Sequence, residues 1–339
     1  MATLNAYGQL TIKELANSKT PNGEMAGIVE VLVQENEILQ DAIWLEANDT
    51  WSHKVVRRAS EPTGTWRKLN SGVGVEASRT VTLLEQIGML EAYSEPDKDL
   101  ILGYPNPAQA RMDEARSFIE GMGKTLATTL IYGNEVGVLA TAETNAPEKF
   151  KGVASRLNAL ATTDNVLNAG GSGSDLTSIY IIQWGPGKVF MVYPKGDPFY
   201  GIKHTDLGEV TVSTSTTAVA SAAQHQAYRD HFQVKAGLVV AHNGSIGRIA
   251  NIETTGSTNL FDEDDLITLL NRMPNAGAGA SIYVNKTVRT QMEIALKDKN
   301  NVNYTADGGE GLAGVPMMRF RGNPIRLVEK ISDAETAET

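Results

Sequence analysis

The sequence predicts an α+β protein that combines an N-terminal arm, a projecting β-hairpin, one long helix and two mixed lobes. Three observations lead to this prediction. Residues 106–132 have the apolar spacing of a long helix, residues 46–95 alternate β-forming with charged residues, and residues 256–330 alternate helical with strand-like stretches. The last pattern is typical of a compact α+β unit.

The composition is that of an ordinary globular protein that can bury a core. The chain has 339 residues, of which 41% are hydrophobic and 21% charged, enough for one large domain or two to three small ones. Its 32 glycines predict many turns. The absence of cysteine excludes disulfides, thiolate metal sites and a cysteine nucleophile, and it fits a reducing cytoplasm.

The charge balance argues against a dedicated nucleic-acid-binding protein. The formal net charge is −10 and the pI about 5.1, whereas phosphate contacts require a basic surface. The first residues lack the basic and apolar regions of a signal peptide. No apolar run approaches the ~20 residues that span a bilayer, so we expect a soluble protein that contacts no membrane.

Residues 1–45 are predicted to form an extended arm. A short helical stretch at Leu10–Ala16 is followed by Pro and Gly residues and then by an apolar run at Ile28–Val33. Neither piece is long enough to be a domain by itself. We therefore expect the arm to dock on another surface.

Residues 46–95 are predicted to contain a long two-stranded hairpin that projects from the body. Its tip is expected at Pro62-Thr63-Gly64 or at Asn70-Ser71-Gly72, since both are turn sequences. A hairpin with few apolar anchors is marginally stable alone and requires a neighbouring surface. Four basic residues in it are candidates for contacts with acidic patches of sister subunits rather than with nucleic acid: Arg57, Arg58, Arg67 and Lys68.

Residues 106–132 are predicted to form a helix about 40 Å long. Asn106 is a good N-cap, Pro107 suits the first helical position, and Gln109 completes a capping box. The apolar residues fall three or four positions apart, at Met112, Ala115, Phe118, Ile119, Met122, Leu126 and Leu130.

The second half of the chain contains further strands and two helices. Strands are expected at 178–183 and 188–193, joined by the tight turn Trp184–Gly187, and again at 228–241 and 246–252. Residues 213–224 are low in complexity and are expected to be a surface connection. A helix from Asp262 to Met273, a strand at 281–284, a helix at 287–297 and a strand at 324–330 complete the prediction.

Gly121–Thr125 (GMGKT) resembles the end of a phosphate-binding loop. The pattern requires a glycine where Phe118 stands and a preceding strand, and here the segment lies inside the long helix. Glycines that allow close packing against the helix are the better interpretation.

The other candidate sites also favour structural interpretations. The acidic run Asp262–Asp265 lacks the spacing of a calcium loop and is suited to cap a helix. The histidines at 53, 204, 225, 231 and 242 lack HExxH spacing, and Gly171-Ser172-Gly173 is no nucleophile elbow. We therefore predict no catalytic, cofactor-binding or metal-binding residue and no cofactor.

Short sequence blocks in a fixed order resemble the Hong Kong 97-type capsid proteins of tailed bacteriophages, specifically the epsilon-15-like branch. The resemblance extends over nearly the whole chain. The blocks are Phe150–Val153, Asn168–Gly171, Asp175–Gly185, Tyr193–Gly196, Gly201–Gly208, Gly237–Val240, Arg248–Ile252, Ile282–Thr287 and Gly322–Arg326.

The resemblance implies a division into an N-terminal arm (1–45), an E-loop with flanking strands (46–96), a P domain with the spine helix (97–255) and an A domain with the C-terminal tail (256–339). It implies a major capsid protein that is not an enzyme. Hexamers and pentamers would assemble in the host cytoplasm into an icosahedral virion shell around double-stranded DNA, which the subunits would meet only through non-specific proximity. A scaffolding function, a portal and a decoration protein would be the partners.

Two other functions remain open from the residues alone. A decoration or tail-tube protein would also assemble without chemistry, although a long helix beside a projecting hairpin suits a shell tile better. A soluble hydrolase or nucleotide-binding protein would require a pocket of convergent polar groups.

Overall fold

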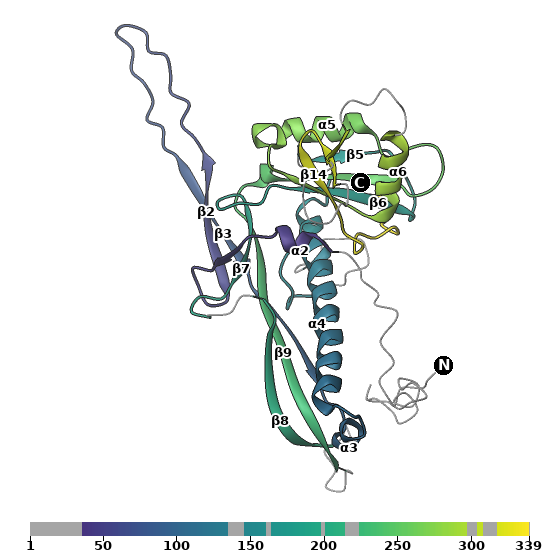
Figure 1. Ribbon diagram of the computed structural model, residues 1–339. Coiled ribbons are helices and arrows are strands. Elements are labelled where there is room, and N and C mark those ends of the chain that lie inside the picture. The colour runs from purple at the N-terminus through teal and green to yellow at the C-terminus, as the bar shows by residue number, and fades with distance from the viewer. Residues whose placement is uncertain are drawn as a thin grey trace. The chain divides into compact units, whose positions relative to one another are not determined.

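The computed structural model describes residues 36–134, 146–160, 164–197, 201–213, 224–296, 304–307 and 317–338. Its helices and strands are drawn in Figure 1, and contacts divide the chain into two compact units. The first comprises Met1–Gln34, Met89–Leu126 and Phe199–Lys235, and the second comprises Glu35–Gly88, Ala127–Pro198 and Ala236–Thr339. The predicted arm helix at Leu10–Ala16 and the apolar run at Ile28–Val33 lie outside the described residues.

The first unit packs a long helix on antiparallel strands. Strand β9 pairs with β8 in antiparallel register and lies beside β4. Phe118 of the helix stacks on Phe232 of β9, with the ring centroids 5.5 Å apart. The elements with residues in this unit are β4 (Gly88–Ser94), α3 (Lys98–Leu102), α4 (Pro107–Tyr132), β8 (Lys203–Ser213) and β9 (Gln224–Val240).

Helix α4 confirms the predicted bounds and its N-cap. The side-chain oxygen of Asn106 accepts a hydrogen bond from the backbone N–H of Gln109 at 3.3 Å. The predicted capping box is wrong, because the Gln109 side-chain amide donates to Asp113 at 2.9 Å instead. The packing role expected for Gly121 and Gly123 is also wrong, since a Cβ at either position would meet no described atom within 4 Å.

The second unit is built around a seven-stranded mixed sheet with the order β12-β13-β14-β11-β6-β10-β5. Helices α5 and α6 share a core with Ile179 and Ile181 of β6, so both cover the same sheet face. Its remaining elements are α2 (Ile38–Asp41), β1 (Trp44–Glu46), β2 (Ser52–Ser60), β3 (Arg79–Gln86), η1 (Ala154–Arg156), β5 (Val166–Asn168), β6 (Leu176–Ile182), β7 (Val189–Tyr193), η2 (Asn243–Ser245), β10 (Ile246–Glu253), α5 (Glu263–Arg272), η3 (Pro274–Gly277), β11 (Ser281–Val284), α6 (Lys286–Leu296), β12 (Tyr304–Asp307), β13 (Met317–Phe320) and β14 (Asn323–Leu327).

Strand β6 forms the middle of this sheet, and it is rich in β-branched residues, with Thr177, Ile179, Ile181 and Ile182. All seven of its residues are buried, which requires cover on both faces. Its neighbours β10 and β11 both run antiparallel to it. The predicted turn after it is confirmed, since Lys188 N–H donates to Gly185 O at 3.0 Å. The strand that follows, β7, belongs to a different sheet, of order β1-β7-β9-β4.

The predicted helices at 262–273 and 287–297 are confirmed as α5 and α6, and the strand at 281–284 as β11. Asp262 caps α5 by accepting from Asp264 N–H at 3.0 Å. The elements that the prediction missed include the short helices α2 and α3 and the strands β1, β5, β8, β12 and β13. None of the described helices is both long and apolar enough to cross a membrane.

Candidate functional site: the β2–β3 hairpin

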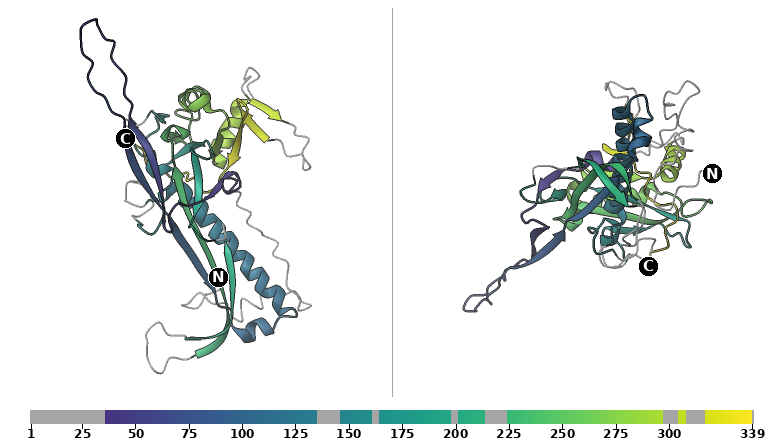
Figure 2. Two further views of the ribbon diagram at one scale, coloured as in Figure 1. Left: turned by 90° about the vertical axis from the view of Figure 1, so that its left-hand side faces the viewer. Right: turned by 90° about the horizontal axis from the view of Figure 1, so that it is seen from below.

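Among the described strands, β2 and β3 pair only with each other, and they continue into a long loop (Figures 1 and 2). The antiparallel register runs from Ser52 opposite Gln86 to Ser60 opposite Arg79. The tip is a turn in which Ser71 N–H donates to Lys68 O at 3.2 Å, with Asn70 in the left-handed region at φ 64°. Of the two predicted tips, the structure selects Asn70-Ser71-Gly72.

The loop between the paired strands carries apolar side chains that none of the described residues covers. Trp66, Leu69 and Val75 are 98, 91 and 102% exposed. Burying a valine or leucine side chain is worth about 1.5–3 kcal/mol, and a tryptophan has a still larger area to bury. Apolar side chains this exposed and this close in sequence are typical of a surface that contacts a protein partner.

The four predicted basic residues lie in two places. Arg57 and Arg58 stand next to each other on β2, where side chains alternate between the two faces of the strand. Arg58 forms an exposed ion pair with Glu61, with a nitrogen–oxygen distance of 2.7 Å. Arg67 and Lys68 are exposed beside the tip turn. The structure thus does not gather the four residues into one cluster, and their predicted contacts with another subunit stay a prediction.

Arg57 fixes the base of the hairpin within its own chain. Its Nε donates to Ala241 O and its Nη1 to Asn243 Oδ1, each at 2.8 Å, and its Nη2 donates to Val240 O. Burial lowers the pKa of Arg57, although arginine still carries its charge at neutral pH. These bonds tie β2 to the end of β9 and to η2.

A second arginine, Arg156, holds strand β3 of the hairpin in place. Arg156 in η1 donates from Nη1 and Nη2 to the two carboxylate oxygens of Glu85, at 2.6 and 2.7 Å. Its Nη2 also reaches Leu238 O at 3.1 Å. Both side chains are nearly buried, so this forked pair is far more protected from water than the Arg58–Glu61 pair. Sequence reasoning missed it, because nothing in the local pattern links residues so far apart.

His53 completes the base of the hairpin. It lies directly opposite Glu85 in the β2–β3 register, and its ring meets the edge of Phe190 with centroids 5.5 Å apart. Its Nδ1 accepts the backbone N–H of Asn48 at 3.3 Å, which requires that nitrogen to be unprotonated. Burial lowers the pKa of His53, and the neighbouring Glu85 opposes that shift only in part.

The remaining candidate residues do not form a second site. Among the described residues, no group of three His, Asp or Glu side chains is placed to hold a metal ion. Asp265 lies in the acidic run at the start of α5, where burial and the charges of Asp262 and Asp264 raise its pKa. Gly121–Thr125 lies within α4, with Thr125 Oγ1 donating to Gly121 O at 3.0 Å. The hairpin is therefore the best candidate for a functional surface.

Comparisons with known proteins point to one family. A family model described as major capsid protein GP7 matches residues 20–339. Among solved structures, a chain of bacteriophage Epsilon15 is 29% identical with a TM-score of 0.70, and 99% of each chain is covered. The bacteriophage JBD30 capsid is 12% identical, with a TM-score of 0.45 and coverage of 95 and 99%. A Mycobacterium phage Bobi chain is 9% identical, with a TM-score of 0.40 and coverage of 73 and 99%. No curated protein sequence matches.

Proposed function

The chain belongs to the family of major capsid protein GP7, and from this membership we propose that its β2–β3 hairpin joins neighbouring subunits of the shell. As expected, the protein has the Hong Kong 97-type fold and builds a bacteriophage capsid from oligomeric capsomers. Family membership decides against the decoration and tail-tube alternatives.

The observation that carries the proposal is the combination of an anchored base and an uncovered tip. Arg57 and Glu85 hold the base in place, while Trp66, Leu69 and Val75 remain exposed. Exposed ion pairs contribute about 0–1 kcal/mol each, so burial of the apolar tip would supply most of the contact energy. The charges of the tip would then orient the hairpin and steer its approach.

The electrostatic partner is a second copy of the chain. The described hairpin residues 52–86 contain six Lys or Arg and three Asp or Glu, whereas the whole chain has 30 and 40. A basic hairpin on an acidic subunit is attracted to the surface of the next subunit. We keep Arg57, Arg58, Arg67 and Lys68 as the proposed basic set, with Arg57 acting through the hairpin base.

Further parts of the proposal rest on the family alone. Hexamers and pentamers would form an icosahedral shell around double-stranded DNA, after assembly in the host cytoplasm with a scaffolding function, a portal and a decoration protein. The division into arm (1–45), E-loop (46–96), P domain (97–255) and A domain (256–339) is part of it. The shell would form by association alone, with no catalytic step by this chain.

Charge reversal at the tip tests the role of the hairpin. We expect the double variant Arg67→Glu and Lys68→Glu to stay folded by circular dichroism but to form few closed shells by negative-stain electron microscopy. The matched control, Arg67→Lys and Lys68→Arg, retains both charges and is expected to assemble like the unaltered chain. Normal shells from the charge-reversed variant with Trp66→Ala added would sink the proposal.

A further inference from the structure

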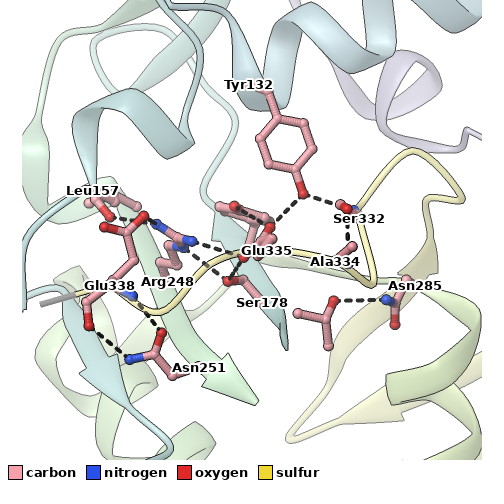
Figure 3. A network of polar contacts seen from close by, with 12 residues as sticks. Tyr132, Leu157, Ser178, Arg248, Asn251, Asn285, Ser332, Ala334, Glu335 and Glu338 are labelled. Atoms are coloured by element: carbon pink, nitrogen blue, oxygen red, sulfur yellow. Dashed lines mark hydrogen bonds and ion pairs between the residues drawn. The ribbon is translucent and has the colours of Figure 1, made fainter. Parts of the chain in front are cut away.

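The last described residues form a strap across the second unit. Glu335 exchanges backbone hydrogen bonds with Leu176 of β6, at 2.8 Å from its N–H and 3.3 Å to its carbonyl. Glu338 N–H donates to Asn251 Oδ1 of β10 at 2.9 Å, and Asn251 Nδ2 donates back to Glu338 O at 3.1 Å. Ser332 N–H donates to the hydroxyl of Tyr132 at 2.8 Å. Residues 332–338, here called the strap, are thus tied to three elements (Figure 3).

The Glu335 carboxylate is surrounded by hydrogen-bond donors. One carboxylate oxygen accepts from Tyr132 at 2.5 Å and from Tyr180 at 3.3 Å. The other accepts from Ser178 at 2.5 Å and from Arg248 Nη2 at 2.9 Å. Burial raises the pKa of both tyrosines, which keeps them protonated as donors. Glu335 is 2% exposed, so its charge depends on these partners.

Arg248 connects the strap to the 3-10 turn η1. Besides Glu335 it binds Glu338 at 2.8 Å, and the same Nη1 donates to Leu157 O at 3.1 Å (Figure 3). Burial acts to lower the pKa of Arg248, but Tyr180 and the two glutamates outweigh it and raise the pKa. Arg248 is 1% exposed and therefore strongly needs both carboxylates of the strap.

The η1 turn in turn holds the hairpin. Leu157 is the C-cap residue that follows η1, and the adjacent Arg156, the last residue of η1, forms the forked pair with Glu85 on β3. On its other side the turn is bonded to the end of α4, since Val153 N–H donates to Leu130 O at 2.9 Å. The strap and the hairpin base are therefore anchored on the same short segment, one residue apart.

We propose that docking of the C-terminal strap positions the β2–β3 hairpin, through Arg248 and the η1 turn. An undocked strap leaves Arg248 buried without its carboxylates, so Arg248 and Leu157 must rearrange, and Arg156 loses its fixed position relative to Glu85. A subunit whose strap is undocked thus has a loosely held hairpin. The importance of the strap for assembly rests on the proposed function, whereas the coupling itself is a property of the single subunit.

Hydrogen exchange on unassembled full-length subunits tests the coupling. In Glu335→Gln, which keeps the size and removes the charge, we expect amides of the strap and of β3 to exchange about tenfold faster or more. Amides of β11, which lies in the same sheet, are expected to keep their rates and so to exclude global unfolding. The matched control Glu293→Gln makes the same chemical change at an exposed position of α6 and is expected to alter neither segment.

A double-mutant cycle then distinguishes coupling between the strap and β3 from two independent effects on their exchange rates. Glu85→Gln frees β3 directly, so adding Glu335→Gln should speed β3 exchange little further. Faster exchange in the strap with unchanged exchange in β3 overturns the proposal. Should Glu335→Gln unfold the subunit, the milder Glu338→Gln replaces it with the same two expectations. Unchanged exchange in both the strap and β3 when Glu335 and Glu338 are each replaced by Gln also overturns the proposal. If the unaltered chain failed to form shells, the proposed hairpin contact between subunits would be wrong. The exchange result would still hold, because it is measured on single subunits.

Discussion

Arg156 and Glu85 lie 71 residues apart in the chain, yet the guanidinium of one grips both carboxylate oxygens of the other at 2.6 and 2.7 Å. The pair lies at the base of the hairpin, where β3 is bonded to η1. Its side chains are only 12 and 9% exposed. The hairpin is thus rigid at its base and uncovered at its tip, which suits an element that reaches across to another subunit.

Breaking this pair from one side is expected to be costly. Arg156→Gln leaves the Glu85 carboxylate buried without its cation, and we expect the free energy of unfolding to fall by about 3–5 kcal/mol. Urea denaturation measures the loss. The control Arg58→Gln breaks the exposed pair with Glu61 and is expected to change stability by about 1 kcal/mol or less. Equal effects of the two substitutions would contradict the structural role given to Arg156.

Stability is expected to fall on acidification because of His53. Burial lowers its pKa below the ordinary value of 6.5, so the unfolded chain takes up a proton before the folded chain does. The contribution of His53 is therefore complete above its ordinary pKa and is lost as the pH falls through and below 6.5. Unfolding free energies between about pH 5 and 8 should show a shallower decline for His53→Gln than for the unaltered chain. Parallel curves would refute the assignment.

The glycines of α4 and the glycine just after it give opposite predictions. Gly121→Ala and Gly123→Ala should each raise the free energy of unfolding by up to about 1 kcal/mol, because alanine favours the helix and its Cβ meets no described atom. Gly133→Ala should destabilise, since its Cβ would lie 2.3 Å from Phe150 O. Thermal denaturation of the three variants checks the contrast. A loss of stability at Gly121 would mean that another contact requires the glycine.

Helices and the hairpin turn were predictable because their determinants are local. The N-cap at Asn106 and the apolar spacing set the bounds of α4, and the Asp262 cap did the same for α5. Strands β8, β12 and β13 were missed because short or polar strands are defined by their partners rather than by their own pattern. Met112 and Ile119 fit the predicted apolar stripe but are 57 and 41% exposed, so spacing alone did not show which end of the helix is covered.

The sequence predicted the candidate site only as a stretch of chain, without the contacts that its side chains make. Composition indicated an exposed basic hairpin, and Arg67 and Lys68 are indeed exposed beside its tip. It could not show that Arg57 is held by the backbone carbonyl of Val240 in β9, since that contact joins residues 183 positions apart. The strap was likewise invisible, because Glu335 and Glu338 look like ordinary residues of a polar tail. Their role depends on Arg248, which tertiary structure alone brings to them.

We propose above all that the hairpin tip contacts a second copy of the chain. A photo-crosslinking amino acid in place of Trp66 tests this directly, in assembled shells and in dissociated subunits. After irradiation, denaturing electrophoresis of the shells should give a crosslinked dimer, and the dissociated subunits should give monomers. Monomers alone from fully formed shells would show that the tip makes no such contact.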